Sequence, residues 1–141
     1  MTDEKTLVID RVLDASPERV FAAWTDTAQL ARWYGPEGMK AEIFANDVTP
    51  GGRYELVMRS DEGEYFLSGV YEAIDPPHKL VMTWKWKTSE ESTRVTIELN
   101  PEGDKTHLRL THTGFAEAEQ VTSHNHGWSS SLNDLARYLA S

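Results

Sequence analysis

The stretch between residues 40 and 113 alternates apolar with polar side chains, and this alternation constrains the fold more than any other feature of the chain. Runs such as KLVMTWKWK and TRVTIELN place apolar residues at every second position, which is the period of a strand with one buried face. Turn-forming sequences, TPGG, SDEG, DPPH and PEGD among them, separate the runs. Six runs joined by such short turns favour an antiparallel meander.

The pleat of the predicted strands sorts their side chains between two faces. Met82, Trp84 and Trp86 fall on one face of their run, whereas lysine and threonine side chains fall on the other. In the last run His112 shares its face with Leu108. The sheet should therefore have an apolar, aromatic face and a polar face, and it needs a cover on one side only.

Residues 116–141 change to a helical period and supply this cover. At about 100° per residue the apolar side chains fall on one stripe. The stripe consists of Val121, His124, Trp128, Leu132, Leu135 and Leu139, with Glu117 at its beginning. Gly127 lies within this helix at a cost of about 1 kcal/mol relative to alanine, which indicates close packing at that point.

The N-terminal part reads as a strand, residues 5–14, followed by two short helices. Ser16 is a good N-cap and Pro17 suits the first helical position. The second helix should run from about Thr27 to Trp33 and end before the Gly35-Pro36 pair. The predicted fold is a single α+β domain over residues 1–141. A curved antiparallel sheet of about seven strands wraps round the long C-terminal helix, and the two short helices lie between strands 1 and 2.

The amino-acid composition limits which binding partners and which cellular location we expect. The net charge is −9, from 14 Lys and Arg against 23 Asp and Glu, which disfavours nucleic acid and anionic lipid. There is no Cys, so thiolate chemistry is excluded. The N-terminus lacks the apolar stretch of a signal peptide, and no apolar run approaches the roughly 20 residues of a membrane span. We expect a cytoplasmic protein, either a monomer or a homodimer, with no membrane or nucleic-acid partner.

The polar residues carry little recognisable chemistry. His124 and His126 are two residues apart on a helix and point about 200° from each other, so they cannot share a metal. The sequence contains no His-x-x-x-His, no Gly-x-Ser-x-Gly and no phosphate-binding glycine loop. We therefore expect no metal and no cofactor, and we assign no catalytic residue.

Several motifs together carry a family resemblance. They are ASPERVFAAWTD, LARWYGPEGM, PGGRYEL, GVYEAIDPPHKLVMTW, THTGF and GWSSSLNDLARYL. In this combination the chain resembles the single-domain bacterial form of the activator of heat-shock protein 90 ATPase family, within the SRPBCC superfamily of START-like helix-grip folds. The family usually shows Trp-Trp-Gly-Pro where this chain has Tyr34 in the second position. The eukaryotic co-chaperones of this family carry a separate N-terminal domain that these 141 residues do not contain.

The resemblance implies a cavity between the sheet and the long helix, with the two short helices and the loop after them at its mouth. Ten side chains are then candidates for binding a ligand. They are Trp33, Tyr34 and Met39 at the rim, Trp84, Trp86 and Trp128 deeper, and Met58, Met82, His112 and His124 on the inward faces. The alternative is that these rings are simply core, filling the end of the sheet.

Three functions follow as hypotheses. The first is binding of a small hydrophobic, aromatic ligand. The second is a cyclase-type or hydrolase-type reaction that uses a cavity histidine. The third is interaction with a heat-shock ATPase, which the resemblance implies. We expect binding rather than catalysis, because the fold resemblance and the number of aromatic residues favour it. Burial should keep His124 neutral and hydrogen-bonded to a strand residue or to water.

Overall fold

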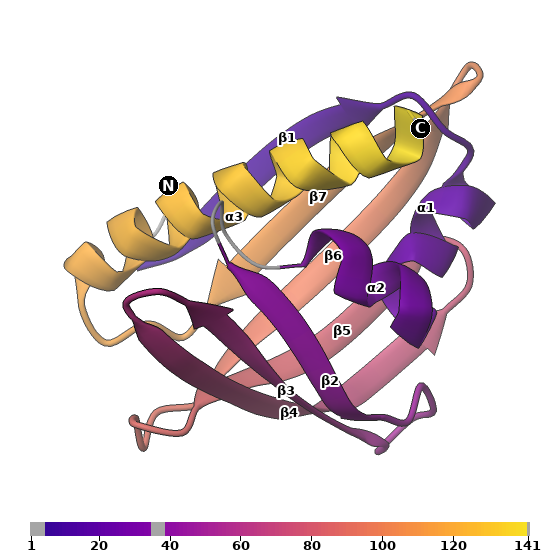
Figure 1. Ribbon diagram of the computed structural model, residues 1–141. Helices are drawn as coiled ribbons and strands as arrows, with labels where there is room; N and C mark the ends of the chain where they lie inside the picture. Colours follow the sequence, from indigo (N-terminus) through magenta and orange to yellow (C-terminus); the bar gives the residue numbers. More distant parts are fainter. Residues whose placement is uncertain (1–4, 35–38, 141) are drawn as a thin grey trace.

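The computed structural model describes residues 5–34 and 39–140, and its elements follow the predicted order (Figure 1). Strand β1 (Leu7–Leu13) precedes helices α1 (Pro17–Thr25) and α2 (Thr27–Trp33). The next six elements are β2 (Lys40–Asn46), β3 (Arg53–Ser60), β4 (Gly63–Asp75), β5 (Lys79–Trp86), β6 (Thr93–Glu102) and β7 (Lys105–Thr113). Helix α3 (Ala118–Ala140) follows them.

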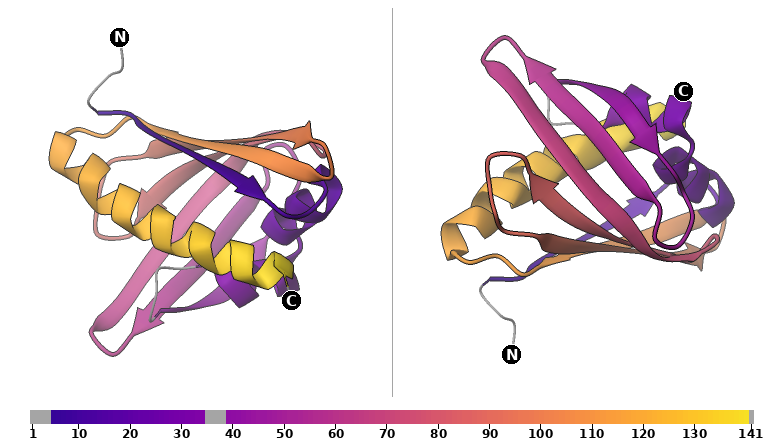
Figure 2. Two further views of the ribbon diagram at one scale, coloured as in Figure 1. Left: turned by 90° about the horizontal axis from the view of Figure 1, so that it is seen from above. Right: turned by 90° about the horizontal axis from the view of Figure 1, so that it is seen from below.

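The strands form one seven-stranded antiparallel sheet in the order β1-β7-β6-β5-β4-β3-β2. Strands β2 to β7 pair with their neighbours along the chain, and β1 pairs with β7. Register shifts in β2 and β4, between Ile43 and Ala45 and between Tyr71 and Ala73, increase the local bend of the sheet. The sheet curves round α3, which lies across its concave face (Figures 1 and 2). The predicted helix-grip arrangement is confirmed.

The two short helices begin and end as their sequences predict. Ser16 is the N-cap of α1, and its hydroxyl accepts a hydrogen bond from the backbone N–H of Arg19 at 3.3 Å. Helix α2 ends at Trp33, and Tyr34 follows in an extended conformation as its C-cap. The Gly35-Pro36 pair that was expected to stop the helix lies outside the described residues.

The hydrophobic core lies between the sheet and α3. Trp128, Leu132, Leu135 and Leu139 are buried on α3, which confirms the predicted stripe. At the beginning of the stripe Val121 and His124 are only half-buried, and Glu117 precedes the helix and is exposed. The core is therefore tightest under the C-terminal half of α3. Among the described residues, no helix combines the length and the apolar character that crossing a membrane requires.

Candidate functional site

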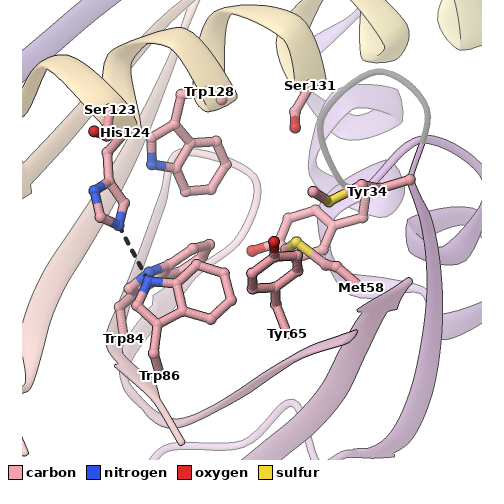
Figure 3. Close-up of a pocket in the computed structure, with 11 residues that line it drawn as sticks. Tyr34, Met58, Tyr65, Trp84, Trp86, Ser123, His124, Trp128 and Ser131 are labelled. Atoms are coloured by element: carbon pink, nitrogen blue, oxygen red, sulfur yellow. Dashed lines mark hydrogen bonds between the residues drawn. The ribbon is translucent and has the colours of Figure 1, made fainter. Parts of the chain in front are cut away.

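A cavity of about 350 Å³ lies under the N-terminal half of α3, where the core is less tightly filled (Figure 3). Helix α3 forms its roof, strands β3, β4 and β5 form its floor, and the end of α2 closes one side. The lining residues are Tyr34, Met39, Met58, Tyr65, Trp84, Trp86, Ser123, His124, Gly127, Trp128 and Ser131. The described lining is thus mostly aromatic, with two methionines and a few hydroxyl groups.

Most of the predicted ligand-binding residues meet at this cavity. The structure places seven of them on its wall: Tyr34, Met39, Met58, Trp84, Trp86, His124 and Trp128. The remaining predicted residues, Trp33, Met82 and His112, do not line it. His112 nevertheless accepts a hydrogen bond from the lining residue Trp128, so it supports the cavity wall.

Trp33 belongs to the core instead of the cavity rim. Its side chain is 3% exposed, and its indole N–H donates to the backbone carbonyl of Ala23 at 2.9 Å. The ring also meets Trp24 edge to face, with centroids 4.7 Å apart. The final turn of α2 directs Trp33 back against α1, whereas Tyr34 leaves the helix in an extended conformation and turns into the cavity.

The correction for Trp33 makes a testable prediction. We expect Trp33→Phe to lower the free energy of unfolding by about 1–2 kcal/mol, because the Ala23 carbonyl loses its donor. Affinity for an apolar probe should stay within about twofold of the wild type, since the ring does not touch the cavity. Urea denaturation and probe titration measure the two quantities. Weakened probe binding at unchanged stability would return Trp33 to the rim.

Met82 lies too far along β5 to reach the cavity, although it shares a face with Trp84 as predicted. It is buried, and it contacts the separate space between Trp24, Tyr54 and Tyr71. The pleat therefore identified the correct face of the strand, but the cavity covers only its C-terminal end.

His112 is fully buried behind Trp128 and takes part in a chain of hydrogen bonds. The indole N–H of Trp128 donates to His112 Nδ1 at 3.1 Å, so Nδ1 must be an unprotonated acceptor. The hydrogen of the neutral ring is then on Nε2, which lies 2.6 Å from Thr93 Oγ1. Thr93 in turn donates to the Trp84 carbonyl at 3.2 Å. Burial, together with the nearby His124, lowers the pKa of His112 to about 3.

His124 is held in a similar way by the other cavity tryptophan. Its Nδ1 lies 2.8 Å from the Gln120 carbonyl, which only accepts, so Nδ1 carries the hydrogen. Its Nε2 accepts from the indole N–H of Trp86 at 3.2 Å, the contact drawn in Figure 3. Burial lowers the pKa of His124, and the bond to Gln120 opposes this shift in part. The expected hydrogen bond between His124 and a strand residue is therefore present, with Trp86 as the partner.

These bonds decide what the site can do chemically. A general base needs a free lone pair within reach of the ligand. The acceptor nitrogens of His112 and His124 both receive indole N–H groups, so neither is free. Burial also raises the pKa of the Tyr34 phenol well above its ordinary value, which keeps that hydroxyl neutral. The described wall is therefore uncharged. Nowhere in the described part of the chain do three potential metal ligands gather.

Sequence reasoning missed Tyr65, Ser123, Gly127 and Ser131 on the cavity wall. Tyr65 shares a pleat face with the buried Leu67, and this signal was available in the alternation of β4. Ser123, Gly127 and Ser131 recur at intervals of four on α3, so they form one line along the helix beside its apolar stripe. Gly127 had been interpreted as a sign of close packing. Gly127 also lines the cavity.

The chain is thus a helix-grip protein with a cavity between its sheet and its long helix, and the described part of the cavity wall is aromatic and uncharged. It belongs to the family described as activator of Hsp90 ATPase homolog 1-like protein, whose sequence profile matches residues 14–140. The predicted family is confirmed.

Solved structures agree with this assignment. A crystal structure of a Chromobacterium violaceum protein is 27% identical, with a TM-score of 0.91, and the match covers 97% of this chain and 98% of that one. The AHSA1 protein of Silicibacter pomeroyi is 31% identical, with a TM-score of 0.87, over 96% of this chain and 97% of that one. No curated protein sequence matches the chain.

Proposed function

We propose that the protein binds a small hydrophobic molecule with aromatic character in the cavity beneath α3. The observation that carries this proposal is an aromatic cavity of about 350 Å³ whose two nearby histidines are already bonded to tryptophans. Its volume lies at the lower end of the range for small-molecule sites, about 300–1,000 Å³. Apolar walls with a few polar groups are also typical of such sites.

The arrangement of rings favours an aromatic guest. Trp84 and Trp86 meet edge to face with centroids 5.5 Å apart, and Tyr65 meets Trp86 in the same manner at 6.5 Å. Such clusters offer both ring faces and ring edges to a further ring. Met39 and Met58 add flexible thioether groups, which adapt to the outline of a guest and contact aromatic rings favourably.

Binding without turnover explains the histidines better than catalysis does. A cyclase-type or hydrolase-type reaction would need His112 or His124 to exchange protons with the ligand. Each would first have to break its bond with Trp128 or Trp86. The heat-shock ATPase that the family description suggests remains a separate partner hypothesis. Pull-down of such an ATPase, with stimulated ATP hydrolysis, would favour it.

The test of the proposed function has two parts. Native mass spectrometry of the freshly purified protein should reveal a co-purified small molecule, and unfolding should release it. Titration with N-phenyl-1-naphthylamine, an uncharged fluorescent aromatic, should give saturable binding with one site per chain. Absence of saturable binding would overturn the proposal.

Filling the cavity from its roof should abolish this binding. We expect Gly127→Leu to weaken probe affinity at least about tenfold, because the added side chain enters the space that the probe occupies. The fold should remain, since leucine is a better helix former than glycine. The matched control is His126→Leu, an exposed position one residue earlier on α3. Equal probe affinity in the two variants would place the probe elsewhere.

A further inference from the structure

Ser131 has a hydroxyl that faces the cavity and lacks a partner among the described residues. Its side chain is 4% exposed on α3, and it points from the helix into the cavity (Figure 3). A serine inside a helix often bonds the carbonyl four residues earlier, as Ser123 does with Glu119 at 3.3 Å. Within residues 5–34 and 39–140, Ser131 Oγ makes neither this bond nor any other.

This hydroxyl faces the cavity, so water can pair with it when no ligand is bound. A ligand that displaces such water without replacing its hydrogen bond loses affinity, whereas a ligand atom that pairs with the hydroxyl restores the bond. A hydroxyl both donates and accepts, so it matches either a carbonyl or a hydroxyl oxygen. Since the neighbouring wall is aromatic, this oxygen should be carried on an otherwise apolar ligand.

The charges around the cavity select against an anion. No lysine or arginine is among the described lining residues, and the lone pair of His124 is taken by Trp86. A carboxylate would therefore exchange its hydration for neutral donors alone, with no cation to balance its charge. The net charge of −9 adds long-range repulsion.

The faces of the aromatic rings are the one feature of the described cavity wall that attracts a cation. The described wall carries no carboxylate to pair with it. A cationic group would also lose its hydration inside this apolar cavity of about 350 Å³. An extended neutral ring system fills this space and keeps contact with Trp84, Trp86 and Trp128.

We propose that the ligand is an uncharged, flat aromatic molecule with one hydroxyl or carbonyl oxygen, and that Ser131 Oγ forms a hydrogen bond with that oxygen. This inference rests on the proposed function of the cavity, and it adds the charge and the polar group of the ligand.

Four probes that share one ring system test the proposal at neutral pH by isothermal titration calorimetry. They are naphthalene, 2-naphthol, 2-naphthoate and 2-naphthyltrimethylammonium. We expect 2-naphthol to bind at least about tenfold more tightly than naphthalene, because it pairs with Ser131. The anion and the cation should bind at least about a hundredfold more weakly than 2-naphthol.

Two serines that are two residues apart on α3 supply the variant and its control. Ser131→Ala should remove the advantage of 2-naphthol over naphthalene and leave naphthalene affinity unchanged. Ser129→Ala should keep the advantage, because Ser129 Oγ donates to Asn125 outside the cavity. Melting curves verify that both variants fold. If the affinities of Ser131→Ala do not decide the question, Ser131→Phe is a second variant, and it should lose binding of 2-naphthol.

The possible failures are distinguishable. Tight binding of 2-naphthoate or of the ammonium probe would overturn the inference, and so would an advantage of 2-naphthol that survives in Ser131→Ala. If naphthalene binds as tightly as 2-naphthol, the cavity binds apolar rings but Ser131 has no role. If naphthalene itself does not bind, the proposed function fails and the inference fails with it.

Discussion

Replacing Trp128 with alanine is expected to lower the free energy of unfolding by about 3–5 kcal/mol, as for other buried large aromatics. The Trp128 ring lies between the core and the cavity, 5.9 Å from Trp24 and 5.0 Å from Trp84 between centroids. The substitution also leaves His112 Nδ1 without its donor. Since domains hold roughly 5–15 kcal/mol in total, this single change can remove a large part of the stability.

Urea denaturation followed by circular dichroism measures this loss. Trp128→Phe, which keeps a ring but not the N–H, should fall between the wild type and Trp128→Ala. Trp86→Ala is the matched control, because Trp86 is only half-buried and should cost clearly less. A Trp128→Ala protein with a near-native midpoint would mean that α3 presents a different face to the sheet.

Acid should destabilise the fold through His112. The unfolded chain takes up a proton near the ordinary pKa of 6.5, whereas the buried ring does so only at about 3. Between these values the unfolded state binds more protons, so stability falls as the pH falls. The slope reaches at most about 1.4 kcal/mol per pH unit for one histidine. The lowered pKa of His124 acts in the same direction.

The variant His112→Asn isolates this effect. Asparagine cannot gain a proton in this range, and its side-chain oxygen can accept from Trp128. The difference in unfolding free energy between wild type and variant should shrink steadily as the pH is lowered from about 6.5 to about 3. His126→Asn, at an exposed position, is the matched control. If the unfolding free energies of the wild type and His112→Asn changed in parallel with pH, the His112 ring would not be buried and neutral.

The sheet and helices were predictable because their signals are local and repeated. A period of two with turn residues between runs determines strand number and face, as Met82 and Trp84 illustrate. The start of α1 at Pro17 follows from the capping preference of Ser16. In each case neighbouring residues carry enough information to define the element.

The site was less predictable because it depends on depth and on the direction of single side chains. Trp33 and Tyr34 are adjacent, yet one turns into the core and the other into the cavity, since α2 ends between them. His112 lies on the predicted face, but Trp128 stands between it and the cavity. A search for large apolar residues also overlooks Gly127, which lines the cavity without a side chain.

Helix α3 carries two neighbouring lines of residues that have different roles. Trp128, Leu132 and Leu135 anchor the helix to the sheet, whereas Ser123, Gly127 and Ser131 set the height and polarity of the space beside them. Changes of size on the second line leave the anchoring line intact. A protein built in this way can acquire a new guest by a few substitutions without rebuilding its scaffold, which makes this line of α3 the natural place to begin engineering a sensor.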